Sequence, residues 1–146
     1  MHPEIERRAT GSWKRVAKDK ASVFAGTDVA RWLAEKQVDT ITIAGFMTNN
    51  CDLATAAGAE ELGLAAEILS DATGAVHLAN EAGKVPAGQL HQTLLVLLQS
   101  NFAAAADTDT WAAAVESGKA LPRSGLGTSA ARGRAAYQGS ESPATA

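Results

Sequence analysis

Short apolar runs alternate with longer amphipathic segments along most of the chain. The apolar runs are rich in isoleucine, leucine and alanine, and such short runs are typical of buried strands. The expected strands are Ile41–Gly45, 65–72 and a short run that begins at Ala103. The amphipathic segments carry apolar residues three or four positions apart and predict helices. The expected helices are 27–37, 47–63, 86–102 and a last one that ends at Ser117.

Signals for helix ends support these boundaries. Thr27 is a good N-cap for the first helix, Gly63 stops the second, and Pro86 suits the start of the third. The third helix is also expected to carry one apolar face, formed by Leu90, Leu94, Leu97 and Leu98.

Strands that alternate with helices at this spacing predict βαβ units. We therefore expect an α/β fold with three αβα layers around a parallel, Rossmann-like sheet. Residues 13–18 are expected to add a short strand that ends at Lys18. Since sites in such sheets form outside the carboxyl ends of the strands, Lys18, 46–51 and 71–74 are expected to be neighbours.

The C-terminal part differs in composition from the rest of the chain. Residues 118–146 are rich in glycine, alanine and serine, and their apolar bulk is too small to offset the entropy of ordering them. We therefore expect one folded domain over 1–117 and a disordered tail over 118–146.

Composition and charge exclude several classes of function. Hydrophobic residues make up 46% of the 146 residues and charged residues 20%, which suits a folded body with a core. A net charge of −3 argues against a nucleic-acid binder and a polybasic membrane protein. The chain has no apolar run of ~18 residues and begins with charged residues where a signal peptide is apolar. We therefore expect a soluble, cytoplasmic protein without nucleic-acid or membrane partners.

The cysteine and histidine content limits the chemistry further. A single cysteine excludes an intrachain disulfide and any CxxC site. The histidines, His2, His77 and His91, have no metal-ligand spacing, and the glycines of the tail do not form a phosphate loop between a strand and a helix. We expect neither a metal nor a cofactor.

Cys51 lies where the strand Ile41–Gly45 is expected to turn into the next helix. A sulfur at such a junction meets unpaired helical N–H groups, which favour the thiolate and are also placed to hold an oxyanion. An ammonium from Lys18 in the same crevice would favour the thiolate further. The alternatives are that Cys51 is a small buried hydrophobic residue and that Lys18 belongs to a solvated basic edge.

Three sequence motifs occur in the order and with the spacing of a known protein family. They are KDKASVFAGTD from Lys18, ITIAGFMTNNC ending at Cys51, and LSDAT from Leu69. Together they resemble the isochorismatase-like cysteine hydrolases, a family that includes nicotinamidases and N-carbamoylsarcosine amidohydrolases. The resemblance spans roughly residues 2–116.

The resemblance implies a role for each matching residue. Cys51 matches the nucleophile and Lys18 the catalytic lysine, while the backbone N–H groups of Met47 and Cys51 match the oxyanion hole. The Phe46–Met47 bond matches a peptide bond that is cis in relatives. With a cysteine at position 51, the chain resembles the amide-hydrolysing branch of this family. The residues expected to line a substrate pocket are Phe46, Asn49, Asn50 and His77.

The family's third catalytic residue is an aspartate on its first strand, ahead of the lysine, and these 146 residues hold no counterpart before Lys18. We expect an N-terminally truncated sheet without the family's first two strands, and an exposed edge beside Ile41–Gly45. Asp52 directly follows Cys51 and is expected to point away from the site, and Asp71 to cap a turn.

Two functions remain open. The first is a hydrolase in which Cys51 attacks a small amide or related C–N bond and forms an acyl-enzyme. The second is a non-catalytic remnant that acts as an interaction module through its exposed sheet edge. A third, plainer alternative is a structural α/β domain with an inert cysteine. Independently of these alternatives, we expect a homo-oligomer.

Overall fold

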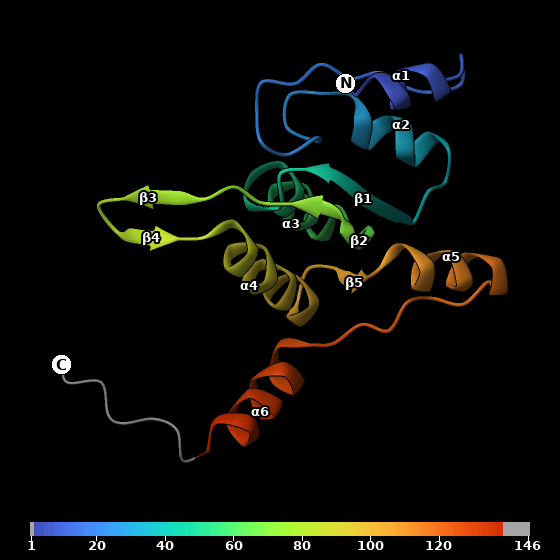
Figure 1. Ribbon diagram of the computed structural model, residues 1–146. Coiled ribbons are helices and arrows are strands. Elements are labelled where there is room, and N and C mark those ends of the chain that lie inside the picture. Colours follow the sequence, from blue (N-terminus) through green and yellow to red (C-terminus); the bar gives the residue numbers. More distant parts are fainter. Residues whose placement is uncertain (1, 139–146) are drawn as a thin grey trace.

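A parallel sheet of three strands forms the centre of the molecule (Figure 1). The computed structural model describes residues 2–138. The strands are β1 (Thr40–Phe46), β2 (Ala65–Gly74) and β5 (Ala104–Ala106), in the order β1-β2-β5. This arrangement confirms the expected α/β fold with a parallel sheet.

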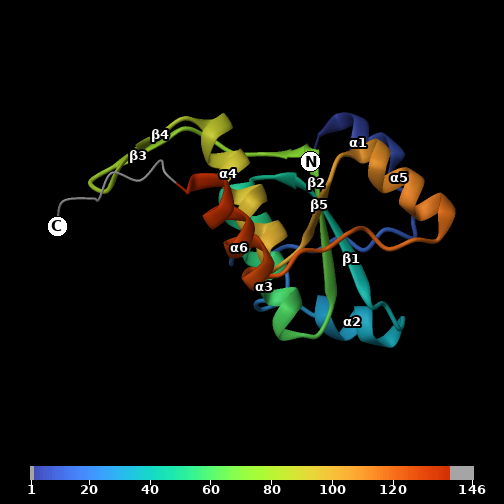
Figure 2. The same ribbon diagram turned by 90° about the horizontal axis from the view of Figure 1, so that it is seen from below.

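Helices cover both faces of this sheet. Figure 2 shows α3 (Leu53–Glu61) and α4 (Ala87–Ser100) on one side and α5 (Thr108–Ser117) on the other. The core lies between β1, β2 and the α3–α4 layer. It is built from small and aliphatic side chains: Ile43, Ala56, Ala59, Ala66, Ile68, Leu95, Leu98 and Ala103.

The opposite face of the sheet is held by polar contacts. The indole Nε1 of Trp111 on α5 donates to Glu67 Oε2 at 3.0 Å and to Thr42 Oγ1 at 3.2 Å. At the N-terminus of α5, Asp107 accepts from the Thr110 N–H at 2.7 Å and caps the helix, as the expected capped turn requires.

The remaining elements lie around the sheet. They are α1 (Pro3–Arg8), α2 (Val29–Glu35), the five-residue π-helical turn η1 (Thr48–Asp52), α6 (Leu126–Tyr137) and the hairpin β3 (Leu78–Asn80) with β4 (Gly83–Val85). The hairpin projects away from the body in both views (Figures 1 and 2). Within residues 2–138, no helix is long and apolar enough to cross a membrane.

The structure differs from the sequence prediction at residues 13–18. These residues form no strand, and no other strand among residues 2–138 pairs with them. A strand needs a ladder partner, so an extended apolar–basic segment without one stays irregular. Its side chains hold it instead: Lys14 Nζ, for example, lies 2.9 Å from Asp28 Oδ2.

The structure also differs over the expected tail. Residues 126–137 form α6, which packs on α4, and Leu121 before it is buried. The side-chain amide of Gln99 on α4 donates to the Pro122 carbonyl at 3.1 Å. Alanine and arginine are strong helix formers, so a helix docked on α4 is compatible with this composition. The rest of the predicted tail, 139–146, lies outside the described residues.

Candidate active site

Cys51 lies in the turn that joins β1 to α3. The turn begins with a cis peptide bond between Phe46 and Met47, as the resemblance implies. The Met47 carbonyl then accepts from the N–H groups of Asn50, at 3.0 Å, and Asp52, at 3.3 Å, and closes η1. Cys51 is half-buried in this turn and is not in a disulfide. Cys51 therefore lies just beyond the carboxyl end of β1, an edge strand of the sheet.

Lys18 contacts this sulfur directly. Its Nζ lies 3.2 Å from Cys51 Sγ, although the two residues are 33 positions apart in the chain. The same Nζ donates to the carbonyls of Lys20, at 2.9 Å, and Ala21, at 3.0 Å. Since an ammonium has three donors, these three contacts fix its position. The structure therefore places a fixed cation directly beside the cysteine sulfur.

Two residues on α3 hold the loop that carries Lys18. The Thr55 hydroxyl accepts from the Val23 N–H at 3.1 Å. Gly58 lets the loop come close, because a Cβ there would lie 2.9 Å from Ser22 Oγ and 3.1 Å from Phe24 Cδ2. Cys51 and α3 follow one another in the chain, so the helix that continues from the cysteine also positions the lysine.

Asp52 does not point into solvent beside Cys51 but is buried. Only 5% of its surface is exposed, and its Oδ2 has no hydrogen-bond partner. Burial raises the pKa of the Asp52 carboxyl, against the opposing charges of His91 and Lys18. The sequence prediction for Asp52 assumed ordinary α geometry, and the π-helical turn that contains the residue was not foreseen.

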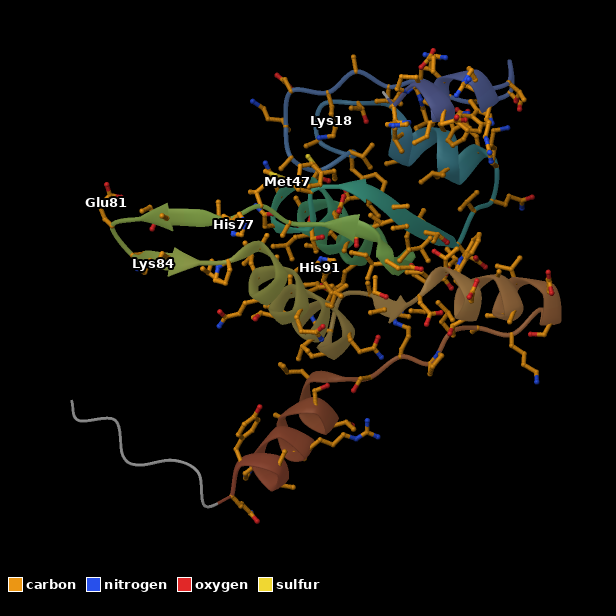
Figure 3. All side chains as sticks on the ribbon, viewed as in Figure 1. Lys18, Met47, His77, Glu81, Lys84 and His91 are labelled. Atoms are coloured by element: carbon orange, nitrogen blue, oxygen red, sulfur yellow. The ribbon has the colours of Figure 1, made fainter. Side chains whose placement is uncertain are left out.

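The side chain of His91 on α4 contacts the turn η1. Its Nδ1 lies 2.9 Å from the hydroxyl of the fully buried Thr48, and its Nε2 lies 2.9 Å from the Ser70 carbonyl. A carbonyl only accepts, so Nε2 carries a proton and the His91 ring connects η1 to β2. Figure 3 shows Lys18 and His91 on opposite sides of Met47. As the sequence indicates, His91 is a partly buried helix residue.

The expected pocket residues have different surroundings in the structure. Asn49 Oδ1 accepts from the Val76 N–H at 3.4 Å and ties η1 to the segment after β2. Asn50 is exposed, and Phe46 is 66% exposed with its ring over Gly74. His77 lies at the root of the β3–β4 hairpin (Figure 3), where its Nδ1 accepts from the Ala87 N–H at 3.1 Å. It lines a cavity of about 450 Å³ with Leu78, Ala79, Lys84, Val85 and Pro86.

Asp71 is engaged elsewhere. Its Oδ1 accepts from the Thr108 N–H at 2.9 Å and the Thr108 hydroxyl at 2.8 Å, at the start of α5. Within residues 2–138, no group of three or more histidine, cysteine or acidic side chains is placed to hold a metal ion. Asp19 directly follows Lys18 and Asp52 directly follows Cys51 in the chain.

A parallel αβα sheet with a cysteine at the carboxyl end of β1 is typical of the class of α/β proteins whose sites form at that edge of the sheet. The isochorismatase domain model matches residues 1–110 of the chain. The chain belongs to the isochorismatase family.

Solved structures agree with this assignment. A putative isochorismatase from Burkholderia xenovorans LB400 is 45% identical with a TM-score of 0.89, over 94% of this chain and 65% of that one. A cysteine hydrolase from Pseudomonas syringae pv. phaseolicola 1448A is 28% identical with a TM-score of 0.66, over 68% and 47% of the two chains. An isochorismatase from Pseudomonas putida KT2440 is 28% identical with a TM-score of 0.61, over 64% and 48%. The chain thus spans less than two thirds of the length of these relatives.

Proposed function

We propose that the chain is a cysteine hydrolase of the isochorismatase family that cleaves a small amide or related C–N bond. The observation that carries the proposal is the 3.2 Å contact between Lys18 Nζ and Cys51 Sγ. It places a fixed cation beside the chain's single cysteine, at the carboxyl end of β1. This is the environment that activates a sulfur nucleophile.

The proposed reaction proceeds in two stages. The Cys51 thiolate attacks the carbonyl carbon, a C–S bond forms, and the carbonyl electron pair moves onto oxygen, where the backbone N–H groups of Met47 and Cys51 are proposed to bind it. The oxyanion pair returns to re-form the carbonyl, the C–N bond breaks, and the nitrogen takes a proton from solvent and leaves as the amine. Water then attacks the thioester and gives a proton to solvent as the C–O bond forms, and the C–S bond breaks to return the thiolate and release the acid. Phe46, Asn49 and Asn50 are proposed to line the substrate pocket, with His77 at its rim.

The experiment measures ammonia or amine release from a panel of small primary amides and N-carbamoyl compounds, with intact-mass detection of an acyl-enzyme. Cys51→Ala is expected to abolish turnover and the acyl adduct while the far-ultraviolet circular dichroism stays unchanged. Equal turnover in the wild-type chain and in Cys51→Ala would contradict the covalent mechanism. Absence of both turnover and adduct across the panel would count against the hydrolase proposal.

One observation favours a second candidate function, an interaction module. The outer edge of β1 has no partner strand among residues 2–138, and Ile43 is its only buried residue. Open edges pair with other strands, so β1 is proposed to associate with a second copy. Sedimentation velocity tests this proposal: Ala44→Lys on the exposed edge should yield monomer, whereas Ala34→Lys on the exposed side of α2 should not. A monomeric wild-type chain would contradict it.

A further inference from the structure

Thr48, the first residue of η1, is fully buried and is held by a side chain from a distant part of the chain. Its hydroxyl lies 2.9 Å from Nδ1 of His91 on α4, 43 positions further along. The second ring nitrogen of His91, Nε2, donates to the Ser70 carbonyl on β2 at 2.9 Å. Both ring nitrogens are therefore engaged, one by η1 and one by the sheet.

Thr48 lies between the two backbone groups that are proposed to bind the oxyanion. Met47 directly precedes it, and Cys51 follows in the same turn. The N–H groups of Asn50 and Asp52 close the turn at the Met47 carbonyl, at 3.0 and 3.3 Å. Since a backbone N–H lies in the plane of its peptide, the directions of the two proposed donors follow the backbone of this turn. A single π-helical turn has few internal bonds, so contacts from outside it decide how firmly its backbone is held.

Two elements of the core fix the position of His91. Leu95, four positions further along α4 and so on the same side of the helix, packs into the core, as does Leu98. Ser70 belongs to β2, the central strand of the sheet, whose Ile68 is fully buried. The imidazole therefore connects η1 to a helix and a strand that the core holds in place. Groups that must be aimed precisely need this kind of support.

We propose that His91 is a positioning residue of the reaction, which acts through Thr48 to hold η1 so that the Met47 and Cys51 N–H groups point at the carbonyl oxygen of the substrate. The inference rests on the proposed hydrolase function. In this role His91 exchanges no proton with the substrate or the sulfur. The two donors matter most when the carbonyl electron pair moves onto oxygen, because preorganised donors stabilise the charge that develops in the transition state. A displaced turn therefore slows acyl transfer more than it weakens substrate binding.

Two reactions of the cysteine separate this role from a general support of the fold. Hydrolysis of an amide builds negative charge on the carbonyl oxygen and uses the two N–H donors. Alkylation by iodoacetamide forms a C–S bond and breaks the C–I bond without placing charge on an oxygen. Since the chain has a single cysteine, both reactions report Cys51.

The variants remove the contact between Thr48 and His91 from either side. Thr48→Val keeps the shape of threonine without its hydroxyl, and His91→Gln keeps an N–H donor near the position of Nε2 without an acceptor in place of Nδ1. The substrate is the primary amide or N-carbamoyl compound that the wild type hydrolyses fastest. We expect each variant to lower kcat at least about tenfold with little change in KM, and to change the alkylation rate by less than about twofold.

Two further variants show whether the residues act through one contact. The double variant Thr48→Val with His91→Gln should be no slower than either single variant, because all three lack the same bond. Thr48→Ser keeps the hydroxyl and should retain most of the activity. The control is Thr93→Val, an exposed position of α4 near His91, which should leave both reactions unchanged. Wild-type turnover in Thr48→Val or His91→Gln would overturn the inference, as would an equal fall in hydrolysis and alkylation.

Amide hydrogen exchange tests the same contact without any substrate. Protection of the Asn50 and Asp52 N–H groups, which close η1, should fall at least about fivefold in His91→Gln and stay unchanged in Thr93→Val. Equal protection in the wild type and His91→Gln would overturn the inference, whatever the turnover. Failure of the hydrolase proposal is seen separately, as absence of turnover and of the acyl adduct in the wild type.

Discussion

The Thr55 hydroxyl accepts from the Val23 N–H at 3.1 Å, and this bond joins the helix that follows Cys51 to the loop that carries Lys18. Val23 lies in the loop that contains Lys18, and Thr55 lies one turn beyond Cys51. The contact between Lys18 and Cys51 therefore depends on a bond made by neither of them. Thr55 is buried, so the bond is shielded from competing water.

Thr55→Val tests this dependence. Valine has the shape of threonine but leaves the Val23 N–H without its acceptor, which should lower the free energy of unfolding by about 1–2 kcal/mol. Alkylation of Cys51 near neutral pH should slow several-fold, because Lys18 is held less firmly. The control is Thr93→Val at an exposed position of α4, where the Thr93 hydroxyl donates to the Gln89 carbonyl of the same helix. Equal alkylation rates in both variants would show that the loop is held by other contacts.

Two glycines within helices should respond to alanine with opposite signs. Gly58→Ala places a Cβ 2.9 Å from Ser22 Oγ and 3.1 Å from Phe24 Cδ2, so the loop must move and we expect a lower Tm. Gly88 on α4 has nothing within 4 Å, and Gly88→Ala should raise stability by about 0.5–1 kcal/mol. Thermal unfolding measures both. A higher Tm for both variants would contradict the close approach of the loop to α3.

Lys18→Met removes the cation from the sulfur while it keeps much of the side-chain volume. Without the ammonium at 3.2 Å, a negative charge on the sulfur no longer has a cation beside it, and alkylation of Cys51 at pH 7 should fall at least about tenfold. Lys20→Met is the matched control, because Lys20 is exposed and its ammonium lies 3.8 Å from Asp19. An alkylation rate in Lys18→Met equal to that of the control would exclude Lys18 as the activating group.

Much of the fold was predictable because hydrophobic periodicity reports directly on burial. The pattern identified β1, β2, α4 and α5 within a few residues of their observed bounds, whereas the helix expected over 47–63 begins as α3 only at Leu53, after η1. The prediction of the apolar face of α4 was only partly right. Leu98 is buried, but Leu97 is 42% exposed and Leu95 is buried in its place. A run of leucines fits more than one helical face, and only packing against the sheet decides between them.

The site was predictable where a motif fixes the residues, as for Cys51 and Lys18, which the structure brings together. It was not predictable where the backbone leaves ideal geometry. The π-helical turn η1 turns Asp52 inward, whereas an α-helix would have pointed it away. The contact of His91 with Thr48 joins residues 43 positions apart, and neither residue carries a local signal of such a contact.

Replacement of His91 should destabilise the turn that holds the nucleophile. His91→Leu leaves the Thr48 hydroxyl and the Ser70 carbonyl without their partner, and an unsatisfied buried group costs about 1–3 kcal/mol. The comparison is His77→Leu, which removes a single bond to the Ala87 N–H at an exposed position and should cost less. Chemical denaturation measures both free energies, and a larger loss for His77→Leu would contradict the bridging role of His91.

The raised pKa of Asp52 predicts how stability depends on pH. A carboxyl whose pKa is higher in the folded state holds its proton more firmly there than in the unfolded chain, so folding is weakened as pH rises from the unfolded to the folded pKa. Below the unfolded pKa, about 3.9 for aspartate, both states are protonated and the effect disappears.

Asp52→Asn cannot ionise, so it should melt at a higher temperature than the wild type near pH 7. The gap should close as the pH falls toward 4, whereas the exposed control Asp109→Asn should show no such pH-dependent gap. A wild type that gains stability over Asp52→Asn as pH rises would mean that Asp52 is stabilised as a carboxylate.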